Sequence, residues 1–191
     1  MRPIDKPSQI DKEVPSAGFL LVAHPLQNDG YFKHTVVLLI LHSAEEGALG
    51  LILNRPLQKK LGEYHSDLSG SELANIPLYD GGPVGKDQLT LIAWKWDGKE
   101  CIQKFYFGID EEKACQIIEM CPEFEIRGFL GHSGWGEGQL EEELEMDSWV
   151  LCPVAPELMG LESLNAWQSI LSLQGPKMKI LAEELEDPHL N

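Results

Sequence analysis

Two apolar runs separated by five residues constrain the fold of this chain more than any other feature. The first is HTVVLLILH, residues 34–42, and the second is ALGLILN, residues 48–54. The segment between them, SAEEG, is polar and ends in Gly47. Two such runs joined by a short turn that contains glycine predict a β-hairpin. Because the runs are almost continuously apolar, we expect both faces of the hairpin to be buried.

The other strands are predicted from shorter apolar or alternating segments. Residues 88–94 and 101–108 alternate and flank Asp97-Gly98, so they predict a second hairpin. Residues 78–85 are rich in glycine and predict a turn. Further strands are expected at three apolar segments, 18–24, 125–131 and 148–154.

Four helices are predicted, one of which follows the glycine-rich segment at 131–138 and is described below. The clearest follows Asp110, a potential N-cap, and precedes Pro122; its apolar residues recur at helical spacing, at Ala114, Ile117, Ile118 and Cys121. A short helix is expected over residues 57–64. A last helix is expected over residues 163–174, with Ser163 as its cap, Gly175-Pro176 after its end, and an inward face made of Leu164, Trp167 and Leu171.

The order of these elements predicts the fold class. Strands come early and in hairpins, whereas helices come later and are few, which argues against repeated βαβ units. We therefore expect an α+β domain with a largely antiparallel or mixed sheet. A chain of 191 residues with 43% apolar residues suits one domain with a real core. The expected division is a polar leader (1–17), a single domain (18–182) and an acidic tail (183–191).

The charge of the chain excludes one class of partner. The formal net charge is −16, and no Lys or Arg occurs from Gly128 to Pro176. Nucleic-acid binding depends on Lys and Arg displacing counterions from phosphates, so direct binding to nucleic acid is not expected. The acidic stretch is either a solvated face or a surface for a basic protein partner.

No membrane, metal or cofactor site is expected from the sequence. No apolar run approaches the roughly 18 residues that span a bilayer, and the N-terminus lacks the apolar core of a signal peptide, so we expect a cytoplasmic protein. The four cysteines form no CxxC pair, and buried thiols are expected at Cys101, Cys115, Cys121 and Cys152. The six histidines are scattered, and neither GxGxxG nor a Walker A motif occurs. These motifs do not test for a metal site assembled from residues that are far apart in the sequence.

The segment GHSGW, residues 131–135, resembles the nucleophile elbow of serine hydrolases. A strand that runs into a sharp turn and then a helix would expose Ser133 as a nucleophile. Three observations oppose this hypothesis. The second glycine of the elbow is replaced by Trp135; only His189 follows the serine as a potential base; and acidic residues at the start of the next helix, Glu137 and Glu141, would compete with a bound anion.

The alternative is a glycine-rich turn that serves the fold. Glycines at 131, 134, 136 and 138 would let the backbone turn between strand and helix, and Leu140 and Leu144 would anchor that helix. Trp135 is then either a core residue or an exposed binding platform. Gln139 is either a hydrogen-bonding residue of the cap or a ligand contact.

Three separated segments together resemble the AlgH/YqgE family of bacterial proteins. They are HPLQNDGYFKHTVVLLILHSAEEGALGLILNRPL (24–57), GGPV (81–84) and GHSGWGEGQLEEEL (131–144), and they occur in the family's order. The resemblance extends from about Gly18 to Val154. The matching positions are His24, Pro25, Asp29, Phe32, Thr35, Gly47, Gly50, Asn54, Arg55, Pro56, Gly81, Gly82, Pro83, Gly131, Gly134, Trp135, Gly138, Gln139 and Leu140.

The resemblance implies a fold more than an activity. It implies an α+β domain whose branched sheet rolls into a pseudo-barrel flanked by helices. No biochemical activity is established for the family, which is associated with transcriptional regulation but has no recognised DNA-binding motif. This chain departs from the family pattern at His132, where Tyr is usual, at Ser133, where Ala is frequent, and at Gly30, where Pro is common. Because Ala is accepted at 133, a nucleophilic serine is not implied.

The leading hypothesis is a non-enzymatic, cytoplasmic protein that binds a protein partner or a small ligand and has a regulatory role. The candidate binding residues lie at turns, where loops commonly carry function: Asn54, Arg55, Gly81, Gly82, His132, Ser133, Trp135 and Gln139. Arg55 could bind a carboxylate of a ligand or form an internal ion pair. The alternative function is a serine hydrolase that uses Ser133.

Overall fold

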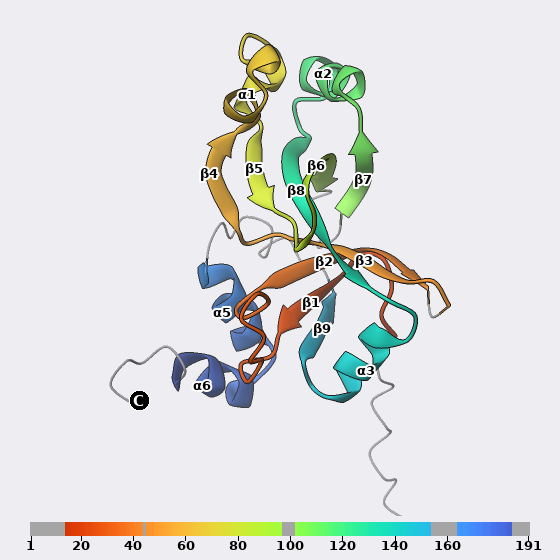
Figure 1. Ribbon diagram of the computed structural model, residues 1–191. Coiled ribbons are helices and arrows are strands. Elements are labelled where there is room, and N and C mark those ends of the chain that lie inside the picture. The colour runs from red at the N-terminus through yellow and green to blue at the C-terminus, as the bar shows by residue number, and fades with distance from the viewer. Residues whose placement is uncertain (1–13, 44, 97–101, 154–163, 185–191) are drawn as a thin grey trace, which may run out of the picture.

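The computed structural model describes residues 14–43, 45–96, 102–153 and 164–184 (Figure 1). Its strands are β1 (Phe19–Ala23), β2 (Val36–Ser43), β3 (Gly47–Ile52), β4 (Pro56–Lys60), β5 (Pro77–Asp80), β6 (Val84–Trp96), β7 (Ile102–Ile109), β8 (Glu125–Trp135) and β9 (Trp149–Pro153). Its α-helices are α1 (Leu61–Tyr64), α2 (Glu111–Met120), α3 (Gln139–Glu145), α5 (Leu164–Leu173) and α6 (Pro176–Glu184). Two 3₁₀ turns, Ser66–Leu68 and Glu72–Asn75, follow α1.

The strands form one branched sheet centred on β8. Its order is β4-β5-β8-β3-β2-β1-β9, and β6 also pairs with β8 and carries β7. β8 pairs with β5 in parallel and with β6 and β3 antiparallel. In Figure 1, β8 runs from the part of the sheet beside α1 and α2 down to the part beside α3. The expected α+β fold with a mixed, branched sheet is confirmed, but the nine described strands do not close, so "pseudo-barrel" describes them only loosely.

Both predicted hairpins are present. β2 and β3 pair antiparallel from Val37↔Ile52 to Ser43↔Gly47, and residues 36–40 are buried, as expected from their continuous apolarity. β6 and β7 pair antiparallel from Leu91↔Ile109 to Trp96↔Ile102. The tip of that second hairpin, residues 97–101, lies outside the described residues.

Two of the predicted helices form as expected. The Asp110 carboxylate caps α2 by accepting a hydrogen bond of 2.7 Å from the backbone N–H of Lys113, and Ala114 and Ile117 are buried. In α5, Trp167 is fully buried, and its indole N–H donates to the Ala23 carbonyl at 2.7 Å. Ser163, the expected cap of α5, lies outside the described residues.

The prediction of a helix over 57–64 is wrong in its first half. Pro56–Lys60 form β4, and only Leu61–Tyr64 are helical. Pairing with β5 holds the segment extended, through Pro56↔Tyr79 and Lys60↔Pro77, and Gln58 has a left-handed φ of 54° that a right-handed helix does not allow.

Two further boundaries differ from the prediction. The expected turn at 78–85 begins as a strand, because Leu78 and Tyr79 are buried and pair with β8. Pro176 ends α5 as expected but also begins α6, because a proline at the first helical position needs no N–H partner. α6 extends to Glu184.

The core is divided between two apolar clusters. The larger lies around β1, β2 and β3 with Trp135, Trp149 and Trp167, and the smaller lies beneath α1 and α2. Cys152 is buried in the larger cluster, whereas Cys115 and Cys121 are only half-buried and Cys101 is outside the described residues. In the described part of the chain, no helix is long and apolar enough to cross a bilayer.

Candidate functional site

The three motif segments meet at one backbone junction. The Asp80 N–H donates to the Arg55 carbonyl at 2.9 Å, and the Gly81 N–H donates to the Leu130 carbonyl at 2.8 Å. The Ile52 N–H in turn donates to the Gly81 carbonyl at 3.0 Å. Segments around residues 52–55, 80–82 and 130–133 are therefore joined directly, through backbone groups.

Gly82 makes this close crossing possible. It has a φ of 151°, and a Cβ placed on it would lie 2.1 Å from the carbonyl carbon of His132. Gly131 is equally constrained, since its Cβ would lie 2.6 Å from the Gly82 carbonyl oxygen. No side chain fits between the two backbones at these points. The glycines of two motifs thus let the β5–β6 connection lie directly on β8.

Ser133 belongs to a strand and not to a turn. β8 continues to Trp135, because Ser133↔Gly50 and Trp135↔Ala48 pair it with β3. The turn expected over the glycines from 131 to 138 is therefore wrong in its first half, and the chain turns only at 136–138. The Ser133 side chain is fully buried, and its hydroxyl donates to the Gly81 carbonyl at 3.3 Å. Its neighbour His132 is half-buried.

Trp135 faces the core. It is 5% exposed and stacks on Phe32, with ring centres 6.3 Å apart, and it meets Trp149 edge to face. Its indole N–H donates to Glu143 of α3 at 2.9 Å, and the Trp149 indole N–H donates to the same carboxylate oxygen at 2.7 Å. One carboxylate therefore satisfies two buried indoles.

Gln139 closes the turn before α3. Its side-chain oxygen accepts from the Gly136 N–H at 3.1 Å, and its amide donates to the other oxygen of Glu143 at 2.8 Å. α3 begins at Gln139, later than expected, so Glu137 precedes the helix. Glu141 lies in its first turn, and Leu140 anchors it in the core as predicted.

Asn54 holds the loop before β2. It is 5% exposed, its side-chain oxygen accepts from the Val36 N–H at 2.9 Å, and its amide donates to the His34 carbonyl at 2.8 Å. Both polar ends of this side chain are thus occupied by backbone groups, and the contacts observed for Asn54 are structural.

Arg55 lies on a half-exposed surface beside Tyr31. Its guanidinium donates to the Tyr31 carbonyl and lies over the Tyr31 ring, 4.8 Å from the ring centre. The Lys86 ammonium lies over the same ring at 4.9 Å, so the two cations are less than about 10 Å apart. The Tyr31 hydroxyl donates to both oxygens of Asp80, at 2.7 and 2.8 Å. We call these four residues, Tyr31, Arg55, Asp80 and Lys86, the Tyr31 surface.

The electrostatics of the Tyr31 surface leave its cations available. Burial and the hydrogen bond to Asp80 raise the pKa of Tyr31, so its hydroxyl stays protonated and continues to donate. Asp80 also accepts from the Gly82 N–H at 3.2 Å. Within the described residues, the ion pairs involve other side chains, and neither Arg55 nor Lys86 is paired with a carboxylate.

Three of these four residues were not among the sequence candidates. Tyr31 lies within a quoted motif segment and Lys86 follows the GGPVG turn, so their motif context was visible. Their convergence depends on the loop at 24–34 folding back onto the β5–β6 connection, which no sequence pattern indicates.

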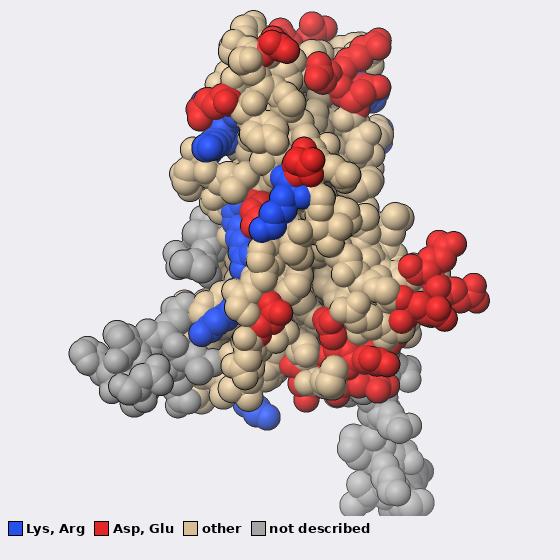
Figure 2. All heavy atoms as spheres, in the orientation of Figure 1, with Lys and Arg blue, Asp and Glu red and all other residues tan. Residues whose placement is uncertain are grey.

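Figure 2 places this surface in the charge distribution of the molecule. On the face shown, Asp and Glu gather over the helices at the top and around the lower right. Lys and Arg instead form a broken band across the middle and left, with Asp and Glu side chains among them, where β4 and the start of β6 lie in Figure 1. In the middle of this face, near β4 and the start of β6, positive side chains are therefore exposed on a protein that is otherwise acidic.

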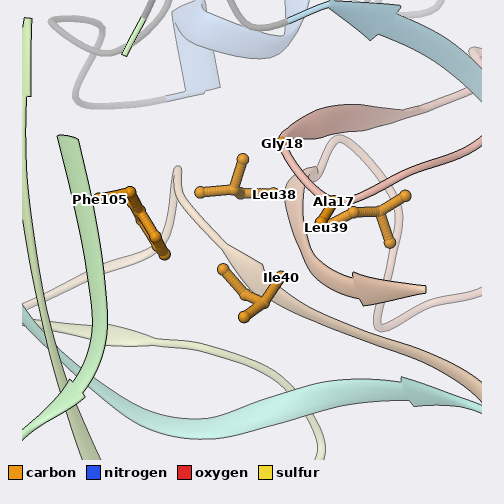
Figure 3. Close-up of a pocket in the computed structure, with 6 residues that line it drawn as sticks. All are labelled: Ala17, Gly18, Leu38, Leu39, Ile40 and Phe105. Atoms are coloured by element: carbon orange, nitrogen blue, oxygen red, sulfur yellow. The ribbon is translucent and has the colours of Figure 1, made fainter. Parts of the chain in front are cut away.

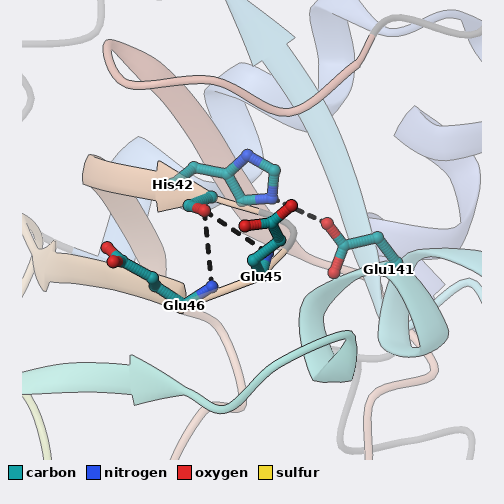
Figure 4. Close-up of polar contacts among 5 residues, drawn as sticks. His42, Glu45, Glu46 and Glu141 are labelled. Carbon is teal, nitrogen blue, oxygen red and sulfur yellow. Dashed lines mark hydrogen bonds and ion pairs between the residues drawn. The ribbon is translucent and has the colours of Figure 1, made fainter.

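Two other features lie apart from the Tyr31 surface. An apolar hollow of about 300 Å³ separates Phe105 of β7 from β2 (Figure 3), and it is lined by Ala17, Gly18, Leu38, Leu39, Ile40 and Phe105. At the end of β2, Nε2 of His42 lies 2.7 Å from a carboxylate oxygen of Glu141 in α3 (Figure 4). In the adjacent turn, the backbone N–H groups of Glu45 and Glu46 both donate to the Ser43 hydroxyl. Among the described residues, no three His, Cys, Asp or Glu side chains are grouped as metal ligands.

Comparison with known proteins gives one consistent result. A family model described as AlgH-like (DUF179) matches residues 20–179. A UPF0301 protein of Chlorobium limicola is 34% identical over 96% of this chain and 99% of its own, and one of Cytophaga hutchinsonii is 34% identical over 91% and 98%. A crystal structure of a Corynebacterium diphtheriae protein superposes with a TM-score of 0.71 at 21% identity, covering 91% of this chain and 94% of the other. The solution structure of the AlgH protein from Pseudomonas aeruginosa gives 0.66 at 24% identity, covering 90% and 96%. At these identities, the two structures are similar in fold.

Proposed function

We propose a binding function for this chain, which belongs to the AlgH-like family. The protein is non-enzymatic, and its Tyr31 surface binds an anionic group of a protein partner or small ligand. The single observation that carries the proposal is the position of Arg55 and Lys86. Both cations lie over one tyrosine ring, in a chain with a net charge of −16, and neither is paired with a carboxylate in the described residues.

The composition of the surface supports an interface. Tyr and Arg are enriched at protein interfaces, because a rigid ring and a planar cation bind with little loss of side-chain freedom. Here the ring is held by Asp80 and the guanidinium by the Tyr31 carbonyl, so both groups are preorganised. Of the sequence candidates, Arg55 would contact the ligand directly, whereas Gly81 and Gly82 would set the shape of the surface.

The serine hydrolase alternative gains no support from the geometry. A nucleophile needs access to substrate and a base that removes its proton. Ser133 is fully buried, and its hydroxyl hydrogen is directed at a backbone carbonyl. We therefore favour binding over catalysis, and a regulatory role in the cytoplasm remains part of the proposal.

Binding of a small anionic probe tests the proposal. We expect fluorescently labelled hexaglutamate to bind the intact protein in low salt, and we expect Arg55→Ala and Lys86→Ala each to weaken binding about fivefold, the upper range for an exposed ion pair. Lys104→Ala, at an exposed lysine of β7, is the matched control and should have no effect. Equal affinity in all four proteins would contradict the proposal.

A second measurement addresses the alternative. A fluorophosphonate probe should not label the folded protein, and Ser133→Ala should behave as the parent does. Labelling that disappears in Ser133→Ala would instead support a hydrolase.

A further inference from the structure

We infer that β4, the strand directly after Arg55, docks an extended acidic segment of a protein partner, which adds to the sheet as a further strand. The inference rests on the proposed function and names the class of its partner. It depends on three features of β4: its place in the sheet, its irregular pairing, and its charge.

The place of β4 leaves one side open. β4 ends the strand order and pairs with β5 on one side; no other described strand pairs with it. An edge strand presents unpaired backbone N–H and C=O groups, which an incoming strand can use for main-chain hydrogen bonds. The edge begins at Pro56, next to Arg55, so a docked segment would lie beside the Tyr31 surface.

The pairing of β4 with β5 is interrupted at its middle. Only Pro56↔Tyr79 and Lys60↔Pro77 are in register, and Gln58 between them has a φ of 54°. A hollow of about 270 Å³ is lined by residues of both strands and of α1, namely Pro56, Gln58, Lys59, Lys60, Glu63, Pro77, Leu78 and Tyr79. An alternating segment on the edge could place a side chain in this hollow, which supplies specificity beside the backbone bonds.

The charge of β4 selects the partner. Lys59 and Lys60 are exposed, Arg55 directly precedes the strand, and Lys86 lies over the same Tyr31 ring as Arg55. Lysines on an edge discourage pairing with most strands, because the incoming strand must accommodate them. A segment rich in Asp or Glu meets no such penalty, so the same lysines make the edge selective.

A peptide is favoured over nucleic acid by the rest of the molecule. A net charge of −16 repels a polyphosphate chain, which carries a charge on every nucleotide, more strongly than a peptide in which only every second residue is charged. A peptide also supplies backbone donors and acceptors that can pair with the free backbone groups of the edge strand.

The test uses a ten-residue peptide of alternating Glu and Val with the intact, isotopically labelled protein. We expect saturable binding, amide shift changes on residues 57–60, and slower hydrogen exchange of those amides. Reversing charge with Lys59→Glu/Lys60→Glu should weaken binding at least tenfold, and Lys104→Glu on β7 should leave it unchanged. Glu63→Gln should tighten it slightly, because Glu63 is the acidic side chain of the hollow.

A second peptide separates strand addition from simple charge attraction. The same sequence with N-methylated amides at alternate positions keeps every carboxylate but loses backbone donors, so we expect it to lose binding at least tenfold. Equal binding of the methylated peptide, or shift changes away from β4, would overturn the inference while leaving hexaglutamate binding at Arg55 and Lys86 intact. Equal binding of an oligothymidylate of the same length would overturn the choice of an acidic peptide.

Discussion

At the scale of single residues, two carboxylates of this protein serve neutral donors instead of cations. Glu143 accepts hydrogen bonds from Trp135, Trp149 and Gln139. Asp80 accepts from the Tyr31 hydroxyl and the Gly82 N–H. Among the described residues, neither Arg55 nor Lys86 forms an ion pair, although the Asp80 carboxylate belongs to the same surface. The abundance of acids therefore does not imply that each base is paired.

Removing the Glu143 carboxylate should be costly. Glu143→Ala leaves two buried indole N–H groups without an acceptor, and we expect the free energy of unfolding to fall by about 2–4 kcal/mol. Glu142→Ala, an exposed position on the same helix, is the control and should change it by less than about 0.5 kcal/mol. Urea denaturation followed by tryptophan fluorescence measures both, and equal effects would show that the indoles do not depend on Glu143.

His24 should make the protein less stable in mild acid. Burial lowers the pKa of His24 below 6.5, an effect that Asp147 opposes and Lys177 reinforces. Its Nδ1 also accepts a hydrogen bond from the Leu26 N–H, and only the neutral ring can accept this bond. The unfolded chain therefore binds the proton first, so stability that is present above about pH 6.5 is lost as the pH falls from there through the lower pKa of the folded state. Unfolding of the parent and of His24→Asn should diverge below this pH; parallel pH profiles would contradict the assignment.

At the scale of elements, β8 determines where the motifs lie. Its first half is held between β5 and β6, and its last three residues pair with β3. The connection from β5 to β6 crosses it with no room for a side chain at Gly82 or Gly131. The motif glycines are thus explained by the contact of two backbones.

A methyl group at this crossing should disrupt the sheet. Gly82→Ala combines a φ of 151° with a Cβ 2.1 Å from His132, and we expect it to lower the free energy of unfolding by at least about 3 kcal/mol. Gly30→Ala has open space around its Cβ and should cost less than about 1 kcal/mol. Thermal unfolding of the two variants makes the comparison, and a mild Gly82→Ala would mean that the crossing can relax.

Local patterns predicted some elements and missed others for a physical reason. The β2–β3 hairpin and α2 were predictable, because apolar continuity and the Asp110 cap are encoded within each segment. β4 was not, because its extended form comes from pairing with β5, some twenty residues later. Arg55 was predicted as a candidate from its turn position, but its arrangement with Lys86 around Tyr31 arises from tertiary contacts alone.

At the scale of the whole molecule, negative charge dominates the surface. The net charge is −16, and acidic residues crowd the helical ends of the face in Figure 2. Like charges on a compact body repel one another, and this repulsion is relieved when the chain unfolds or when salt screens it. The band of Lys and Arg in the middle of this face is the local exception to the negative surface charge.

Salt should therefore stabilise the protein. We expect the melting temperature to rise by several degrees as NaCl increases from about 0.02 M to about 0.3 M, over which the screening length falls well below the size of a domain. The exposed pair Glu142→Gln/Glu145→Gln should reduce this dependence. Circular dichroism melts provide the measurement, and a melting temperature that falls with salt would indicate that ion pairs outweigh the repulsion.

The pairing of β3 with β8 also has a consequence for synthesis on the ribosome. Ala48 pairs with Trp135, so β3 is made nearly ninety residues before the strand that completes it, and β1 waits still longer for β9. At elongation rates of about 5–20 residues per second, the apolar β2–β3 hairpin emerges seconds before it can be covered. Such non-local pairing slows folding and leaves strand edges exposed in the nascent chain. The nascent hairpin is therefore the segment on which we expect chaperones to act.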